Sequence, residues 1–187
     1  MPAPERTTRA AIVEAARELL EQRGIGGLTM QAVAARVGVR APSLYKRIRD
    51  RDELVGEVVS ATLVDVTARI EAVAAAVADP RARMRAFAGE LRRFGHAYPV
   101  AYSLIFGATS GSAQPPQQQL ERSAAPVLDA VRELVDDDAS LHAARTLTAW
   151  ANGFVLMELA GAFRLGGDVD AAWAWGLERV VAGIGDG

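Results

Sequence analysis

The chain has 187 residues, of which 50% are hydrophobic and 24% are charged, a composition typical of a globular protein. It has no cysteine and only two histidines, so disulfides, thiolate metal sites and cysteine nucleophiles are excluded and little imidazole chemistry is available. No run of about 18 uncharged apolar residues occurs, and residues 1–6 lack the apolar core of a secretion signal. We therefore expect a cytoplasmic protein without a membrane span.

Charge is distributed unevenly along the chain. The net charge is −2, but residues 1–51 carry ten basic and five acidic side chains, whereas residues 52–187 carry eleven and eighteen. The N-terminal part is thus basic and the remainder acidic. This asymmetry favours an N-terminal part that binds a polyanion. A chance cluster of solvated charges would give the same pattern.

The first half of the chain is predicted to be helical, because Ala, Leu, Arg and Glu dominate and alternating strand patterns are missing. A helix is expected over residues 8–23, where apolar residues recur at helical spacing before Gly24. A short helix follows from Thr29, its expected N-cap, to residue 36, and another runs from 41 to 48. A long helix begins at Asp50, within a sequence that resembles a capping box, and ends near residue 78 before Pro80.

The second half is predicted to hold five more helices. They are expected over residues 81–97, 100–106, 120–136, 139–165 and 170–183, with a polar Gly- and Pro-rich loop over 107–119. Asp138 is expected to cap the fourth of these helices, and Gly166 and Gly167 to end it. The sequence thus predicts an all-α protein with one domain over residues 1–50 and a second over 51–187. The structural boundary is expected inside the helix that begins at Asp50.

The segment from Leu28 to Ile48 carries the strongest motif, a helix-turn-helix. Two short helices meet at a turn, where Ala34 permits a close helix crossing and Gly38 accepts a positive φ. Packing Leu44 and Ile48 against the first helix leaves a basic and polar face outward. That face is made of Arg40, Ala41, Ser43, Lys46 and Arg47. It suits the major groove of DNA, and an αα-hairpin that serves only as core is the structural alternative.

This segment and its surroundings resemble the TetR-type (tetracycline-repressor-like) transcriptional regulators. The residues that carry the resemblance are Arg9–Ala16, Gly24–Thr29, Ala34–Val39, Ser43–Tyr45 and Asp52–Leu54. The later part of the chain resembles a subset of the family through residues 94–106 (FGHAYPVAYSLIF) and 152–163 (NGFVLMELAGAF). The resemblance implies a three-helix DNA-binding head, joined by a long helix to a larger helical body that binds a ligand and dimerises.

The resemblance also implies roles for individual residues of the head. Thr29, Tyr45 and Lys46 match positions that usually grip DNA phosphates, whereas residues 40–43 and Arg47 match the part of the helix that lies in the groove. The expected DNA-contacting set is Thr29, Arg40, Ala41, Pro42, Ser43, Tyr45, Lys46, Arg47 and Arg51. Arg40 stands where the family often has a capping Ser or Thr, so we expect it to contact a base or a phosphate.

The last two helices are expected to form a dimer interface. The helix predicted over 139–165 is apolar on two faces between Leu147 and Phe163, and a helix of that kind is buried on both. Resembling proteins pair their last two helices in a four-helix interface, and helix-turn-helix proteins usually bind near-palindromic DNA as twofold dimers. The expected interface residues are Thr148, Ala151, Val155, Leu159, Trp173, Leu177, Val180 and Val181. A thick core within one chain would explain the same pattern.

A cluster of large side chains in the body is the expected ligand site. Such residues most often fill a core, but resembling regulators usually hold a small-molecule pocket among these helices. The set is Phe87, Leu91, Phe94, Tyr98, Tyr102, Ile105, Phe106, Trp150, Asn152, Phe154, Met157 and Glu158. Its apolar character favours a hydrophobic or aromatic ligand. Glu158 needs a partner, which could be Arg145, Arg164, an arginine of a second subunit, or a cationic or hydroxylated ligand.

The sequence therefore predicts a homodimeric transcriptional repressor that a small hydrophobic or aromatic ligand releases from its operator. No nucleophile–base pair, Gly-rich phosphate loop or metal-ligand spacing is evident, so we expect no enzymatic activity, metal or cofactor. Two alternatives stay open. One is a DNA-binding or protein-recruiting module without an inducer pocket, and the other is activation in place of repression.

Overall fold

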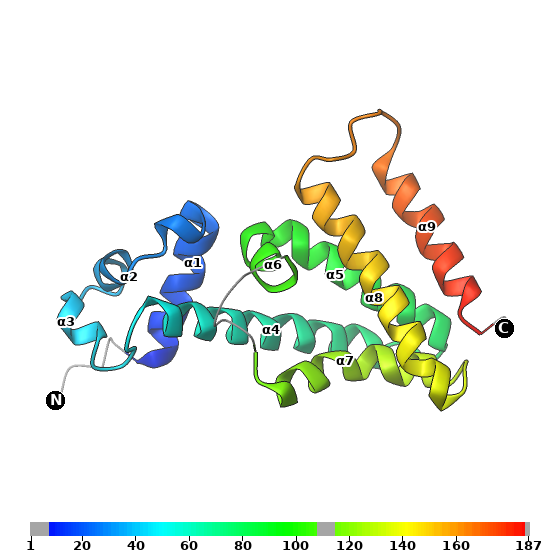
Figure 1. Cartoon of the computed structure of the whole chain (residues 1–187), viewed down its shortest axis with the longest axis horizontal. Coiled ribbons are helices and arrows are strands. Elements are labelled where there is room, and N and C mark those ends of the chain that lie inside the picture. The colour runs from blue at the N-terminus through cyan, green and yellow to red at the C-terminus, as the bar shows by residue number, and fades with distance from the viewer. Residues whose placement is uncertain (1–7, 108–114, 186–187) are drawn as a thin grey trace. The chain divides into compact units, whose positions relative to one another are not determined.

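The computed structural model describes residues 8–107 and 115–185, and all regular elements within these ranges are helices, as predicted. Figure 1 traces them in chain order. They are α1 (Arg9–Gly27), α2 (Met30–Arg36), α3 (Ala41–Leu44), α4 (Arg51–Ala75), α5 (Pro80–Ala97), α6 (Pro99–Phe106), α7 (Gln117–Arg132), α8 (Asp137–Leu159) and α9 (Val169–Gly183). Among the described residues, none of these helices is long and apolar enough to cross a membrane. Residues 108–114 of the predicted loop lie outside the described ranges.

The chain divides into two compact units. The first comprises residues 1–63 and 98–116, and the second comprises residues 64–97 and 117–187. The first unit therefore contains α1, α2, α3, α6 and the N-terminal half of α4. The second contains the rest of α4 with α5, α7, α8 and α9. The division lies inside α4, the helix in which the sequence placed the boundary, whereas the inclusion of α6 in the first unit was not predicted.

Helix α1 is central to the core of the first unit. Its N-cap is Thr8, whose hydroxyl accepts a hydrogen bond from the Ala11 N–H at 3.1 Å. Ile12, Ala16 and Leu20 are fully buried in one apolar cluster that also contains residues 44 and 48, as predicted. Gly24 interrupts the helix with φ 67° and ψ 180°, after which one further turn leads to residue 27.

The helix-turn-helix forms as the sequence predicts, with one difference in length. Thr29 caps α2 by accepting a hydrogen bond from the Ala32 N–H at 3.1 Å, and Gly38 turns the chain with φ 75°. The following helix, α3, ends at Leu44 and not at residue 48. Hydrogen-bonded turns continue from there to Ile48, whose N–H donates to the Leu44 carbonyl at 3.0 Å.

Helix α8 begins earlier and ends earlier than predicted. Its N-cap is Asp136, so Asp138 lies in the first turn and does not cap the helix. It ends at Leu159, because Gly161 takes φ 61° and reverses the chain in a Schellman motif. In that motif the Gly161 N–H donates to Glu158 and the Ala162 N–H to Met157, each at 2.9 Å. The prediction of a helix to residue 165, ended by Gly166 and Gly167, is therefore wrong.

The second unit is built around α5, which packs against α7, α8 and α9. The apolar side of α5 contributes Met84, Phe87, Leu91 and Phe94, all of which are buried. Helices α8 and α9 lie side by side and are connected by the exposed loop over residues 160–168, seen at the top of Figure 1. Asp168 caps α9 by accepting hydrogen bonds from the N–H groups of Asp170 and Ala171.

Candidate functional site

The outward face of the helix-turn-helix holds most of the residues expected to contact DNA. Arg40, Pro42, Ser43, Tyr45, Lys46, Arg47 and Thr29 are exposed, and Ala41 is half-buried. Leu44 and Ile48 are fully buried beneath them, which fixes the orientation of this face. Arg40 is the N-cap residue of α3, and its side chain makes no cap hydrogen bond.

Most other cations of the first unit are held by protein groups. Arg9 donates to Glu53 at 2.6 Å and to Glu57 at 2.8 Å. Arg36 pairs with Glu18, and Arg49 pairs with Asp50. In contrast, neither Arg40 nor Lys46 has a hydrogen-bond or ion-pair partner among the described residues. These two exposed charges are therefore available to phosphates or base edges.

Arg51 differs from the other residues of the expected DNA-contacting set. It is half-buried at the first position of α4, and its guanidinium is directed at the connection between α1 and α2. Its Nε donates to the Leu28 carbonyl at 2.8 Å and its Nη2 to the Ile25 carbonyl at 2.6 Å. The side chain thus satisfies backbone acceptors inside the head.

The start of α4 is stabilised by two carboxylates. Asp50 accepts a hydrogen bond from the Glu53 N–H at 2.8 Å, and Glu53 accepts one from the Arg49 N–H at 2.7 Å. This reciprocal pair of hydrogen bonds confirms the predicted capping sequence. The second donor is the N–H of Arg49, the residue before Asp50, and not the N–H of Asp50 itself. The Arg49 side chain lowers the pKa of Asp50, and the Arg49 N–H together with Arg9 lowers the pKa of Glu53.

The residues expected to line one ligand site are divided between the two units. Tyr98, Tyr102, Ile105 and Phe106 belong to the first unit, and the other eight belong to the second. Tyr102 is fully buried, 4.7 Å from Phe106 between ring centroids, and burial raises the pKa of its hydroxyl. In the second unit Phe87, Leu91 and Phe94 are buried among neighbouring side chains. The sequence could not separate the two groups, because it did not show that α6 packs with the head.

An aromatic cluster joins α8 to α9 within the second unit. The Trp173 ring lies 4.9 Å from that of Trp150 and 5.2 Å from that of Phe154, which in turn lies 4.8 Å from Phe163. Asn152 is half-buried on the same helix, whereas Met157 is 48% exposed. Of these residues, Trp173 was expected at the dimer interface, and Phe163 was not assigned to a site.

Glu158 finds its partner on α5. Arg92 donates to both of its carboxylate oxygens, with Nε–Oε2 3.0 Å and Nη2–Oε1 2.5 Å, and His96 Nε2 lies 3.1 Å from Oε2. The Glu158 side chain is only 11% exposed, and the Arg92 guanidinium and then His96 lower its pKa. Neither Arg145 nor Arg164, the expected partners within the chain, makes this contact.

A hollow of about 800 Å³ opens beside this ion pair. Its lining includes Arg92, His96, Glu158, Asp170 and Trp173. The Arg92 guanidinium lies over the Trp173 ring, 5.2 Å from its centroid. The hollow therefore combines an aromatic wall with charges of both signs. Of the residues predicted to bind a ligand, Glu158 is part of this lining.

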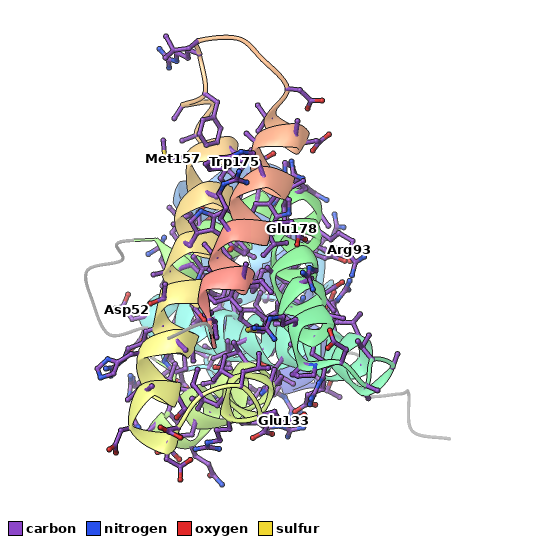
Figure 2. The ribbon with its side chains drawn as sticks, turned by 90° about the vertical axis from the view of Figure 1, so that its right-hand side faces the viewer. Asp52, Arg93, Glu133, Met157, Trp175 and Glu178 are labelled. Carbon is purple, nitrogen blue, oxygen red and sulfur yellow. The ribbon has the colours of Figure 1, made fainter. Side chains whose placement is uncertain are left out.

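The residues expected at a dimer interface face mainly into the subunit. Ala151, Val155 and Val181 have no exposed surface, Trp173 and Leu177 are buried, and the remaining three are half-buried. The opposite stripe of the two helices is exposed instead. We call it the outer face, and its residues are Ala149, Gly153, Met157, Ala172, Trp175, Arg179 and Ala182. The Arg179 guanidinium lies over the Trp175 ring, 3.5 Å from its centroid. Figure 2 shows Met157 and Trp175 at the same end of the α8–α9 pair. Because α8 is apolar on two sides, periodicity could not tell the inward stripe from the outward one.

Comparisons with known proteins cover both units. The family model described as bacterial regulatory proteins, tetR family, matches residues 12–58, and the model described as tetracyclin repressor-like, C-terminal domain, matches residues 84–180. An uncharacterised HTH-type transcriptional regulator of Mycobacterium tuberculosis is 29% identical over 183 residues, which span 97% of this chain and 83% of that protein.

Solved structures share the fold along nearly the whole chain. A protein of unknown function from Rhodococcus sp. RHA1 aligns over 100% of both chains with a TM-score of 0.82 and 24% identity. A TetR variant from Acinetobacter baumannii AYE, solved in complex with minocycline, covers 95% of this chain and 96% of its own with a TM-score of 0.71 and 22% identity. The motif, its exposed basic face and both family matches agree, and this chain belongs to the TetR family of DNA-binding transcriptional regulators, which are not enzymes.

Proposed function

We propose that this TetR-family regulator is a homodimeric repressor of the bacterial cytoplasm that a small hydrophobic or aromatic ligand releases from a near-palindromic operator. The observation that carries the proposal is the outer face of α8 and α9. One helix-turn-helix reads one half-site, so specific binding to a palindrome needs a second head and a surface that pairs two subunits.

The composition of the outer face supports pairing with a second copy. Trp175 is 62% exposed and Met157 is 48% exposed, although large apolar side chains are usually buried. Ala149 and Gly153 on α8 and Ala172 on α9 lie on the same stripes and would let a second pair of helices approach closely. Aromatic residues and methionine are enriched at such interfaces. We propose the outer face as the interface, in place of the inward-facing residues expected from the sequence.

The head supports specific binding to DNA. Arg40, Ser43 and Arg47 are exposed on or beside α3, where side chains can reach base edges in the major groove. Thr29, Tyr45 and Lys46 are exposed around them and suit contacts to phosphates. If the operator overlaps a promoter, the bound protein would block transcription by occupancy alone.

Two features support a ligand in the second unit. The hollow beside Arg92 and Trp173 has the volume of a small-molecule site, and aromatic rings adjoin its wall. A protein of the same fold was solved with minocycline. A ligand of this site would lower the affinity for DNA only by binding the DNA-free state more tightly. Bound DNA would then lower the affinity for the ligand by the same factor.

One observation favours a regulator without an inducer. Phe87, Leu91 and Phe94, which the sequence assigned to the ligand site, are between 1% and 4% exposed and pack within the subunit. Because these large side chains of α5 fill the core, they leave no room for a ligand between the described helices. A ligand would have to bind in the hollow at the surface. A module that binds DNA without a ligand is therefore the second candidate.

The test starts from DNA, because no operator has to be assumed. Purified protein is mixed with sheared genomic DNA at near-physiological salt, and retained fragments are sequenced. A few enriched sites that share an inverted repeat are expected from a dimeric regulator. Enrichment of single half-sites would contradict the dimer, and loss of all binding at modest salt would leave only phosphate attraction.

The same operator fragment then separates the two candidates. Hydrophobic and aromatic compounds are screened for a rise in melting temperature, and each hit is tested for release of the protein from the fragment. Release supports the inducible repressor. Hits that stabilise the protein but leave operator affinity unchanged would support the regulator without an inducer.

A further inference from the structure

The connection between α1 and α2 leaves one buried backbone acceptor, the Leu28 carbonyl, without a donor from its own helices. Gly24 interrupts α1, and in the turn that follows the Ile25 carbonyl accepts a hydrogen bond from the Leu28 N–H at 3.4 Å. The Ala32 N–H, which a continuous helix would offer to the Leu28 carbonyl, is taken by the Thr29 hydroxyl at 3.1 Å. Leu28 has no exposed surface, so water cannot replace that donor. A donor must come from elsewhere in the protein.

Arg51 provides this donor. Its Nε donates to the buried Leu28 carbonyl at 2.8 Å, and its Nη2 donates to the Ile25 carbonyl at 2.6 Å. The two acceptors stand at the two ends of the short segment that precedes Thr29, the N-cap of α2. The planar guanidinium can bind both carbonyls at a defined separation, which an ammonium group cannot do.

We propose that Arg51 is a positioning residue of the DNA-binding head, which acts through the α1–α2 connection and not through a phosphate contact. It belongs to the first turn of α4, while its two hydrogen bonds hold the segment from which α2 starts. Helix α2 in turn packs against α3. Loss of the guanidinium therefore shifts the face that meets DNA without removing a contact to DNA.

The charge pattern of the head separates this role from a phosphate contact. Lys46 is exposed and has no partner among the described residues, as a phosphate-binding cation requires. Arg51 is half-buried, and its Nε donates to a carbonyl that no other donor of the described residues reaches. A phosphate contact contributes to the salt dependence of binding, whereas a positioning contact does not.

The experiment compares Arg51→Lys and Arg51→Gln with wild type in the full chain. The DNA is a duplex that the wild-type protein selects from a random-sequence pool, and affinity is measured over a range of salt at a temperature where unfolding experiments show every variant to be folded. Lys46→Gln serves as the control for a phosphate contact, and Arg36→Lys as the control for an exposed arginine that pairs with Glu18. Amide exchange along residues 25–36 is recorded without DNA.

We expect both Arg51 variants to lose about tenfold or more in affinity at every salt concentration, since a hydrogen bond to a charged group is of that order. The slope of log affinity against log salt stays as in wild type, whereas Lys46→Gln lowers it by about one unit. Amide exchange in residues 25–36 becomes faster in both Arg51 variants and not in Arg36→Lys.

Three results would overturn the proposal. A normal affinity in Arg51→Lys, with a slope about one unit lower in Arg51→Gln, would make Arg51 a phosphate contact. Reduced stability with unchanged affinity of the folded protein would leave it a purely structural residue. Unchanged amide exchange would remove it from the α1–α2 connection, and this readout needs no DNA. The inference rests on DNA binding by the head, but a monomeric or ligand-independent regulator would not affect it.

Discussion

Arginine occurs in three different surroundings in this protein. Arg40 is exposed without a partner among the described residues, Arg92 forms a nearly buried pair with Glu158, and Arg51 donates to backbone carbonyls. Twenty of the 21 basic residues are arginine, so residue type alone carries little information. Burial and the positions of nearby acceptors assign the role.

Arg40 is expected to contribute to sequence specificity. Replacing it with alanine removes a side chain that can hold guanine with two hydrogen bonds, so affinity for the operator should fall by about 1–3 kcal/mol. Discrimination at one base pair of each half-site should fall with it. Binding to operators with each base pair changed in turn measures this. An equal loss on every sequence would identify Arg40 as a phosphate contact.

Lys46 is expected to bind a phosphate. Lys46→Ala should weaken binding to all duplexes alike and reduce the magnitude of the salt slope by about one unit, because one counterion fewer is released. Titrations at several salt concentrations, on the selected duplex and on one of scrambled sequence, give both slopes. A slope equal to that of wild type would exclude Lys46 from the phosphate contacts.

The ion pair between Glu158 and Arg92 is expected to make stability depend on pH in the acid range. The folded pKa of Glu158 lies below its ordinary value of 4.5, so its contribution is complete above that pH and declines as the pH falls through the folded pKa. Glu158→Gln should therefore be less stable than wild type at neutral pH, and the difference should shrink on acidification.

Urea unfolding of both proteins over a pH series measures that difference. Glu14→Gln is the matched control, because Glu14 is exposed on α1 and its ion pair among the described residues is with Arg17, three residues away. A difference that stays constant down to low pH would show that the ion pair does not stabilise the fold. An unchanged affinity for every ligand found in the screen would leave Glu158 with a structural role.

At the scale of elements, α6 depends on a side chain from a different helix. Its N-cap, Tyr98, offers no side-chain cap, and its first residue, Pro99, has no N–H. Glu21 of α1 accepts hydrogen bonds from the next two N–H groups, at 3.2 Å from Val100 and 2.7 Å from Ala101. Its carboxylate thus satisfies the free donors of α6 and holds the helix to the head.

Loss of this contact should release α6. Glu21→Ala should lower the free energy of unfolding by about 1–3 kcal/mol, the range of a lost cap made by a charged acceptor, and Glu21→Gln should lower it less because an amide oxygen still accepts. Urea unfolding measures the loss, and amide exchange at Val100 and Ala101 locates it. Glu14→Ala on the same helix is the control. A free energy of unfolding in both Glu21 variants equal to that of wild type would contradict this role.

At the scale of the whole molecule, two subunits are expected to pair through the outer face. Trp175→Glu places a charge in a surface that pairing would bury, so it should convert the dimer to a monomer with little effect on the fold of the subunit. Leu120→Glu on α7 is the control, because Leu120 is a comparably exposed apolar residue of the same unit. Sedimentation over a range of concentrations gives the state of each protein. A Trp175→Glu protein that sediments as the wild type does would exclude the outer face as the dimer interface.

Local patterns were sufficient to predict the order of the helices, several of their caps and the helix-turn-helix. The cap at Thr29, the positive φ of Gly38 and the capping sequence at Asp50 each depend on a few adjacent residues, and the structure shows all three. Local patterns were misread at the start of α8, where Asp136 and not Asp138 is the N-cap, and at its end, where Gly161 and not the later glycines reverses the chain. The helix after the turn at Gly38 also ends earlier than its pattern predicts, at Leu44. The basic face of the head could also be read from spacing, since Leu44 and Ile48 define the buried side.

The tertiary structure decided the remaining questions, because they depend on residues far apart in the chain. Glu21 and Ala101 are 80 positions apart, Arg92 and Glu158 are 66 apart, and no periodicity links such pairs. The inward face of α8 was equally hidden, since both sides of that helix are apolar and only packing selects one. An all-helical chain with a helix-turn-helix head could be predicted from local sequence, because short-range geometry specifies helices and turns. Packing determined which side chains of α8 and α9 are buried and which are exposed, because that choice depends on contacts between helices far apart in the chain.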